Sequence, residues 1–397
     1  MKNLLYIIAM NEKAQISKQG KKPLKRGFTT GACATGATKS ALNALINGEF
    51  LDPVTIILPK GQKVSFDLER ESQEVSKGIF AKTGIIKDAG DDPDITHGAL
   101  IIAKISHAKN GTGISFSAGK GVGTITKAGL MLKIGQAAIN PVPRLMMEQE
   151  IKQFCKRYKI APDFNVEISV PNGKRLAKKT LNPRLGILGG LSILGTSGIV
   201  VPYSCSAWIS SIHSGINVAK ANGIKHIICA TGNVSENAAK EKFNYPDIAY
   251  IEMGDFIGGT IKFLRKNPID RISIVGGFAK ISKLANGAMD LHSKRSEVDF
   301  EFLAKLAKQL GANEKLVQEV LGANTGKQVL ELSEAANLPL AKLVAQMAQH
   351  EAQKMLKNND IVLDVLITNR SGEIVGFSPT TTLPIGIPPR KGEGNRR

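Results

Sequence analysis

Apolar and polar positions alternate over short stretches in the first half of the chain, and this period of two predicts strands. The stretches with this pattern cover residues 54–58, 63–68, 74–82, 99–106, 113–116 and 166–170. Two longer segments have helical character: residues 32–45, which end near Asn47-Gly48, and residues 143–158, which begin with Pro143. The first half is therefore expected to be α+β.

In the second half, short apolar runs alternate with helical segments, and these runs cover residues 185–188, 226–230, 248–252 and 272–275. Strands that are buried on both faces form continuous apolar runs, so this alternation predicts a parallel sheet with covered faces. Residues 301–357 should form several helices broken at Gly311, Gly322 and Pro339. Residues 361–367 and 373–377 resemble a closing hairpin.

The predicted fold is mixed α/β and α+β: an N-terminal α+β domain, then a Rossmann-like parallel α/β domain with C-terminal helices and a closing hairpin. A single apolar core stops growing at roughly 250–300 residues. A chain of 397 residues therefore suits two domains. We place the first at 24–180 and the second at 181–380. Residues 1–23 are expected to be a flexible lead-in, and residues 381–397 a basic tail.

The charge of the chain points to an anionic ligand. It carries 53 Lys and Arg against 34 Asp and Glu, a net charge of +19, although part of this excess lies in the expected tails. Nucleic acid is not the expected partner, because the sequence has no zinc-finger spacing or aromatic-rich RNA-binding strand, and only 5% of its residues are aromatic. An anionic small molecule fits better.

The compartment is predicted from the cysteines and from the apolar segments. The four cysteines lack metal-site spacing, so we expect no protein-bound metal and a reducing, cytoplasmic environment. We recognise no export signal. Residues 185–219 contain no charged residue, as in a membrane span, but the glycines before Pro202 favour a buried strand and loop. A membrane location is therefore not expected.

Two segments of the first half offer candidate chemistry near the first predicted helix. Arg26, Thr29 and Thr30 precede this helix, whose N–H groups suit a carboxylate or phosphate, although a structural helix cap explains the hydroxyls equally well. A crowded acidic turn at residues 88–98 contains Asp94 and His97. These two are candidates for proton transfer, with a structural turn as the alternative.

Basic residues stand in two other groups. Lys127 and Arg144 accompany glycine-rich and proline-rich sequence and are suited to pair with carboxylates. Lys280 and Lys283 precede His292, a group that suits anion binding or proton transfer. A satisfied structural histidine is the alternative for His292. The other histidines are expected to be structural.

Loops with small or acidic residues follow three predicted strands of the second half. They are Gly195-Thr196-Ser197-Gly198, Thr231-Gly232-Asn233 and Glu252-Met253-Gly254-Asp255. In a doubly wound sheet such loops converge at the carboxyl edge, where nucleosides bind and where Glu252 or Asp255 suits ribose hydroxyls. The fingerprint G-x-G-x-x-G is absent from these loops, which disfavours a nicotinamide cofactor.

Taken together, five parts of the chain resemble the CbiD family, the cobalt-precorrin-5B C1-methyltransferases of cobalamin biosynthesis. They are RGFTTGACATGATKSAL, KDAGDDPDITHG, GVGTITKAGL with AINPVPR, GTSGIVVPYS and GGFAKISKLANGAMDLHS. The resemblance implies methyl transfer from S-adenosyl-L-methionine to ring carbon C1 of a cobalt-bearing, ring-contracted tetrapyrrole. In the implied step the electron-rich ring carbon attacks the sulfonium methyl in line and the neutral thioether leaves, so alignment and exclusion of water should supply most of the acceleration.

The resemblance also implies roles for the candidate residues. The methyl donor is expected at Gly195, Thr196, Ser197, Gly198, Gly232, Asn233, Glu252 and Asp255. The macrocycle carboxylates are expected at Arg26, Thr29, Thr30, Lys127, Arg144, Lys280 and Lys283. Asp94, His97 and His292 are candidates for moving a proton after methylation.

The implied partners are an anionic cobalt-tetrapyrrole substrate and, transiently, other enzymes of the cobalamin pathway. Two other function classes stay open at the level of sequence. A non-catalytic tetrapyrrole carrier or pathway scaffold uses the same binding motifs without turnover. A basic RNA-binding protein shares the net charge.

Overall fold

The computed structural model describes residues 23–358 and 360–379. The predicted lead-in, except for Pro23, and the predicted basic tail lie outside the described residues. The chain divides into two compact units: the first comprises the residues up to Lys127 and Met131–Ser204, and the second comprises Ala128–Leu130 and the residues from Cys205 onward.

The first unit is built on a five-stranded sheet with the order β4-β5-β6-β9-β7. Its strands are β4 (Glu69–Ser76), β5 (Phe80–Ile86), β6 (Leu100–His107), β9 (Phe164–Ser169) and β7 (Ile114–Ala118). Residues 74–82, predicted as one strand, contain the turn between β4 and β5. All neighbours pair antiparallel except β7 and β9, so the predicted α+β character is confirmed.

Helix α2 (Thr30–Asn47) packs on β5 and β6. Its small residues let the backbone approach the sheet closely, since a Cβ on Gly36 would lie 2.8 Å from Cδ1 of Ile85. Alternate residues of β6 are fully buried on this face, among them Ile101 and Ile105. Helix α3 (Pro141–Tyr158) packs beside α2 and begins with the expected proline turn.

Three pairs of short strands and one short helix complete the first unit. The pairs are β1 (Gly27–Phe28) with β11 (Ile199–Val200), β8 (Thr124–Ile125) with β10 (Ile187–Leu188), and β2 (Val54–Ile57) with β3 (Lys63–Phe66); the helix is α4 (Gly173–Ala177). Residues 185–188 were expected in the parallel sheet, and this prediction is wrong because β10 pairs antiparallel with β8. The two units accordingly meet in sequence at Ser204 and Cys205, whereas the sequence placed the boundary after residue 180.

The second unit contains a five-stranded sheet with the order β13-β12-β14-β15-β16. Its strands are β12 (His226–Ala230), β13 (Tyr250–Glu252), β14 (Arg271–Gly277), β15 (Val362–Thr368) and β16 (Ile374–Ser378). The first four are parallel, and β16 pairs antiparallel with β15. The predicted parallel α/β arrangement and the closing hairpin are therefore confirmed.

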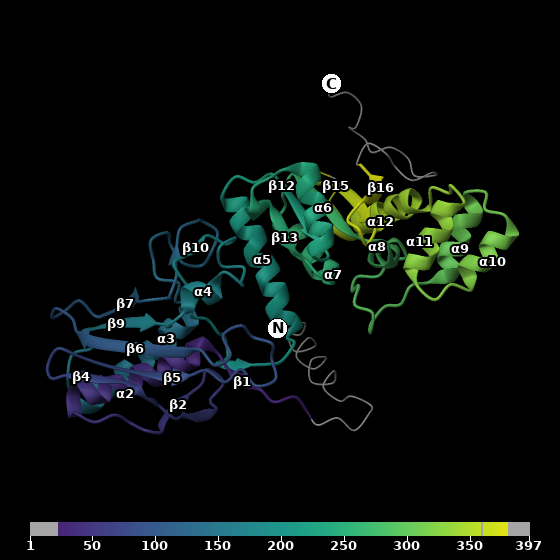
Figure 1. The fold of residues 1–397 in the computed structure, drawn as a ribbon. Coiled ribbons are helices and arrows are strands. Elements are labelled where there is room, and N and C mark those ends of the chain that lie inside the picture. The colour runs from purple at the N-terminus through teal and green to yellow at the C-terminus, as the bar shows by residue number, and fades with distance from the viewer. Residues whose placement is uncertain (1–22, 359, 380–397) are drawn as a thin grey trace. The chain divides into compact units, whose positions relative to one another are not determined.

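Helices cover both faces of this sheet, as Figure 1 shows. Ile227 and Cys229 of β12 belong to the core that contains residues of α5, α7, α8 and α12, whereas Ile228 belongs to a smaller core beside α6. These helices are α5 (Cys205–Ala221), α6 (Asn233–Phe243), α7 (Ile257–Lys266), α8 (Phe278–Ala285) and α12 (Leu340–Leu356), with a short 3-10 helix at Asp247–Ala249. Successive residues of one strand thus enter cores on opposite faces.

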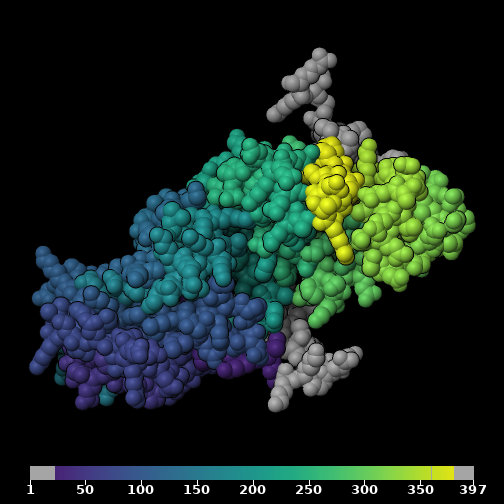
Figure 2. All heavy atoms as spheres, viewed as in Figure 1, coloured from purple at the N-terminus to yellow at the C-terminus, as the bar shows by residue number. Residues whose placement is uncertain are grey.

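The remaining helices are α9 (Phe300–Gln309), α10 (Glu314–Leu321) and α11 (Gly326–Ala335), and they end close to the predicted breaks. In Figure 2 the yellow atoms of β15 and β16 reach the surface between these light-green helices and the remainder of the second unit. Within residues 23–358 and 360–379, none of the helices has both the length and the apolar character needed to cross a membrane. All four cysteines are free thiols.

Candidate functional site

The carboxyl edge of the parallel sheet is where the strand order of the second unit reverses. From β12 the chain continues to β13 on one side, and β14 then pairs with the opposite side of β12. In open α/β sheets the crevice outside the carboxyl ends at such a reversal is the usual ligand site. The loops that follow Ala230, Glu252 and Gly277 therefore frame the candidate site.

Gly232 follows β12 and precedes the first residue of α6. Its φ is 167°, an extended conformation open to any residue, and a Cβ added there would meet no atom within 4 Å. The fold itself therefore does not require glycine at this position. The neighbouring Asn233 is exposed, so both residues border open space at the edge.

Asp255 and Lys280 bring loops of the edge together. The Lys280 ammonium nitrogen lies 2.9 Å from Oδ1 of Asp255 and donates to the carbonyl oxygen of Thr231 at 3.0 Å. The contact with Asp255 is one of charge, because Oδ1 accepts no hydrogen bond from the described residues. Lys280, expected at the macrocycle, is thus placed with the residues expected at the donor.

Lys283 lies one turn further along α8 and is buried. Its ammonium donates to the carbonyl oxygen of Leu291 at 3.0 Å, and the Leu291 N–H donates to the carbonyl oxygen of Asp255 at 3.0 Å. Burial lowers the pKa of Lys283. The segment from Asn286 to Ser296, called the strap below, is held to the edge by these contacts.

His292 lies in the strap. The backbone N–H of Lys294 donates to Nδ1 of the ring at 3.1 Å, so neutral His292 carries its proton on Nε2. Sequence reasoning missed Arg295, which forms an ion pair with Asp290 and whose Nη2 lies 3.0 Å from Sγ of Cys205. Arg295 could have been found from its position three residues after His292, since the segment GGFAKISKLANGAMDLHS ends at Ser293.

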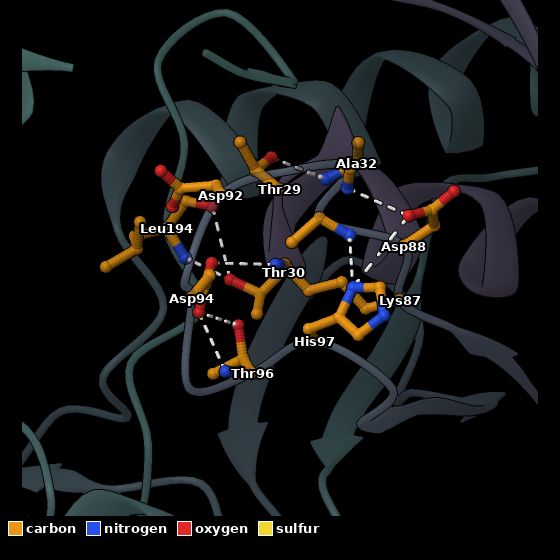
Figure 3. Close-up of polar contacts among 12 residues, drawn as sticks. Thr29, Thr30, Ala32, Lys87, Asp88, Asp92, Asp94, Thr96, His97 and Leu194 are labelled. Atoms are coloured by element: carbon orange, nitrogen blue, oxygen red, sulfur yellow. Dashed lines mark hydrogen bonds and ion pairs between the residues drawn. The ribbon is translucent and has the colours of Figure 1, made fainter. Parts of the chain in front are cut away.

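The N-terminus of α2 in the first unit is capped by the chain itself, as Figure 3 shows for its hydroxyl contacts. Oγ1 of Thr29 accepts from the N–H of Ala32 at 3.2 Å, and the N–H of Gly31 donates to the carbonyl oxygen of Leu194 at 3.0 Å. The hydroxyl of Thr30 contacts both the N–H and the carbonyl oxygen of Leu194. Both threonines are more than nine-tenths buried, so the capping interpretation accounts for them.

The loop Gly195-Thr196-Ser197-Gly198 belongs to this cap. The Gly198 carbonyl oxygen accepts from the N–H of Thr29 at 3.0 Å, and a Cβ on Gly195 would lie 2.3 Å from Oγ1 of Thr29. The sequence placed this loop after a strand of the parallel sheet, which is wrong, because the preceding β10 and the following β11 pair within the first unit.

The acidic turn of the first unit is built around an ion pair with the almost fully buried Lys87, whose ammonium lies 2.8 Å from Oδ2 of Asp94 (Figure 3). Burial disfavours the charged form of Asp94, but Lys87 and hydrogen bonds from Thr96 outweigh it and hold the pKa of the carboxyl below its ordinary 3.8. Nδ1 of His97 accepts from the N–H of Ala89 at 3.1 Å, and the His97 side chain is mostly exposed. Of the side chains of Lys87, Asp94 and His97, that of His97 is the most exposed.

The guanidinium of Arg144 binds two backbone carbonyl oxygens. Its Nε donates to the carbonyl oxygen of Ile139 at 2.7 Å and its Nη2 to that of Ala137 at 3.0 Å, while burial lowers its pKa. Lys127 is half-buried, with the stem of its side chain over Gly186. Arg26 forms a bridge with Gly90 beside the acidic turn.

The chain contains no Asp or Glu between Glu167 and Glu236, a signal that the motif search overlooked. Within the first unit this stretch includes α4 and the residues after it, where four basic side chains are exposed: Lys174, Arg175, Lys178 and Lys179. Exposed basic side chains grouped in this way attract carboxylates. Among the described residues, no group of three or more His, Cys, Asp or Glu side chains is arranged to hold a metal ion.

Comparisons with known proteins match the chain along most of its length. A model of the CbiD family matches residues 17–202, and one of the CbiD C-terminal domain matches residues 290–379. A protein from Brucella anthropi named cobalt-precorrin-5B C(1)-methyltransferase is 54% identical over 357 residues, 90% of this chain and 96% of that protein. One of the same name from Brucella canis is 53% identical over 355 residues, 89% of this chain and 96% of that protein.

Among solved structures, the chain is similar to a 1.9 Å crystal structure of cobalamin biosynthesis protein CbiD from Archaeoglobus fulgidus. The match covers 80% of this chain and 86% of that chain, with 23% identity and a TM-score of 0.37.

Proposed function

The chain belongs to the CbiD family, and from that premise we propose that it is a cobalt-precorrin-5B C(1)-methyltransferase that takes its methyl group from S-adenosyl-L-methionine. The observation that carries the proposal is 54% identity to a protein of that name over 90% of this chain. The product is the C1-methylated macrocycle of cobalamin biosynthesis, cobalt-precorrin-6A.

The carboxyl edge of the second unit suits the methyl donor. Gly232 leaves open space beside Asn233 at the end of β12. Glu252 ends the next strand about 20 residues later, where an acidic side chain hydrogen-bonds ribose hydroxyls in nucleoside-binding sheets. Asp255 adds a second carboxylate, held in place by Lys280. Bound there, S-adenosyl-L-methionine supplies an electrophilic methyl group on a positively charged sulfur.

The residues of this edge contribute position more than acid–base chemistry. The strap, held by Lys283 through Leu291, limits the freedom of the loop that carries Asp255. Fixed loops hold a bound donor in one orientation, and in-line displacement depends strongly on that orientation. We therefore assign Lys280 and Lys283 to the donor edge instead of the macrocycle, and Gly195–Gly198 to the helix cap of the first unit.

For the macrocycle we propose exposed and half-buried cations of the first unit. Lys127 and Arg26 stay in this group, joined by Lys174, Arg175, Lys178 and Lys179 of the acid-free stretch. Peripheral carboxylates of the substrate would pair with these cations. Each exposed ion pair contributes little binding free energy, but several pairs together contribute more. Thr29, Thr30 and Arg144 support this surface indirectly, since their polar groups bind the backbone.

For the proton that moves after methylation, we retain His292 and His97, whose Nε2 atoms carry the proton in the neutral ring. Asp94 is a poor acid near neutral pH, because its lowered pKa keeps it ionised beside Lys87.

Donor binding separates this proposal from a non-catalytic tetrapyrrole carrier, which needs no methyl donor. Titration calorimetry of the full-length protein with S-adenosyl-L-methionine should give a binding isotherm with one site per chain. A protein that binds the macrocycle tightly and gives no heat with the donor would be a carrier.

A further inference from the structure

Trp208 lies in α5 of the second unit and is the only tryptophan of the chain. It is 44% exposed, and it is not among the described residues that build or border the apolar cores. A tryptophan of this kind is unusual, because burial of the indole ring is one of the largest apolar gains a side chain offers. The exposed ring therefore needs an explanation other than packing.

The indole ring is directed to the candidate donor edge. Its Nε1, Cε2 and Cζ2 atoms lie 3.4, 3.6 and 3.7 Å from the position that a Cβ would occupy on Gly254. Gly254 has a φ of 59°, in the left-handed region, and stands between Glu252 and Asp255. The ring thus lies against the loop that carries both carboxylates of the donor edge.

The strap contacts the segments before and after the position of the ring, at Cys205 and at Gly258. One turn before Trp208, Sγ of Cys205 lies 3.0 Å from Nη2 of Arg295 in the strap. Beyond Gly254, the N–H of Gly258 donates to the carbonyl oxygen of Met289, whose side chain is also exposed. Two exposed apolar side chains, Trp208 of α5 and Met289 of the strap, therefore lie beside the segment that follows β13.

We propose that Trp208 stacks on the adenine base of the methyl donor, and this inference rests on the proposed function. A carboxylate at the end of β13 binds the ribose. The base is joined directly to that ribose, so it must lie within a few ångströms of the loop that contains Gly254. An indole ring against this loop offers a flat apolar surface on which a purine base stacks. Stacking of one base on an aromatic side chain contributes about 1–3 kcal/mol to binding. Trp208 is thus a donor-binding residue, not a proton-transfer residue.

Because the chain has one tryptophan, fluorescence excited where tyrosine does not absorb reports on this ring alone. Saturating S-adenosyl-L-methionine should quench the emission of the full-length protein, and S-adenosylhomocysteine, which keeps the adenine but lacks the charged sulfur, should quench it equally. Quenching by the sulfonium compound alone would place the sulfur over the ring and overturn the stacking proposal.

Substitution gives the second readout. Trp208→Ala should weaken binding of both compounds about tenfold in calorimetry, which is about 1.4 kcal/mol, whereas Trp208→Phe should retain most of the affinity. Tyr245→Ala is the matched control, because Tyr245 is equally exposed but stands before the amino end of β13. Circular dichroism should show the fold of each variant unchanged.

The outcomes distinguish this inference from the proposed function. If the parent protein binds the donor and methylates the macrocycle while Trp208→Ala binds the donor equally well, the stacking proposal fails and the function stands. If the parent protein binds neither adenine compound, both fail.

Discussion

Asp255 and Lys280 meet at the carboxyl edge of the parallel sheet with 2.9 Å between Oδ1 and Nζ, and the same ammonium donates to the carbonyl oxygen of Thr231. The pair therefore connects the loop after β13, the loop after β12 and the helix after β14. Two loops and one helix at the carboxyl edge are thus linked by one side chain. This arrangement orders the edge before any ligand arrives.

The first prediction concerns this pair. Asp255→Asn and Lys280→Met should each lower the free energy of unfolding, and the double variant should lose less than the sum by about 0.5–1 kcal/mol, because either single variant already removes the charge interaction between the two partly exposed side chains. Urea unfolding of the four proteins measures this coupling. Asp255→Asn should also weaken donor binding in calorimetry. If the stability changes were strictly additive and the donor affinity were unchanged, Asp255 would have neither of the two roles assigned to it, the ion pair with Lys280 and donor binding.

The second prediction concerns Gly232, where a substitution should change donor binding without changing the stability of the fold. Gly232→Ala should leave the melting temperature unchanged, because the φ of 167° suits any residue and the added Cβ meets nothing within 4 Å. It should nevertheless weaken binding of S-adenosyl-L-methionine, since the methyl group occupies space that the donor needs. Gly322→Ala at the end of α10 is the control, with only an ordinary contact at 3.4 Å. Full donor affinity in Gly232→Ala would show that the donor binds elsewhere.

Much of the second unit could be predicted from its apolar runs, since a strand buried on both faces is a continuous apolar stretch. His226–Ala230 was found residue for residue, and the closing hairpin was located within one residue of β15 and β16. The run at 185–188 has the same apolar character but pairs with β8. A local pattern identifies a strand, whereas the identity of its partner depends on the rest of the chain.

The candidate site was only partly predictable for a similar reason. Residue type identified Asp255 and Lys280 as functional candidates, but not their mutual contact. Arg144 and Thr30 have the chemistry of ligand-binding residues, yet their polar groups bind backbone atoms, those of the nearby Ile139 for Arg144 and those of the distant Leu194 for Thr30. Trp208 carries no motif at all, and only its position against Gly254 makes it a candidate.

The third prediction concerns the buried pair of the first unit. Asp94→Asn should destabilise the protein by about 3 kcal/mol near neutral pH, because it leaves the almost fully buried ammonium of Lys87 without its counter-charge. The folded pKa of Asp94 is lowered, so its contribution to stability is present above about pH 4 and is lost as the pH falls through the folded value. The difference in melting temperature between the parent protein and Asp94→Asn should therefore shrink in acid. A pH-independent difference would contradict the ionised pair.

The fourth prediction concerns His226, which sequence reasoning left without a partner. Its Nε2 lies 2.8 Å from Oγ of Ser273, and burial, followed by the charge of Arg271, lowers its pKa from 6.5 to about 4. The unfolded chain binds this proton below about pH 6.5 and the folded chain only below about pH 4, so stability is complete above the first value and falls between the two.

Denaturant unfolding should accordingly give about 1–2 kcal/mol less stability at about pH 5 than at about pH 7.5 from this residue. His226→Gln cannot titrate, and its stability should depend less on pH over the same interval. Parallel pH profiles of the two proteins would show that His226 is protonated normally in the fold.

Methyl transfer itself tests the central claim most directly. The full-length protein is incubated anaerobically with cobalt-precorrin-5B and S-adenosyl-L-methionine carrying an isotopically labelled methyl group, and the macrocycle is analysed by mass spectrometry and carbon NMR. We predict one labelled methyl group per macrocycle, attached to ring carbon C1, and a lower yield of labelled macrocycle with the Asp255→Asn variant at a donor concentration that does not saturate it. A macrocycle that binds the protein but returns unlabelled would contradict the methyltransferase.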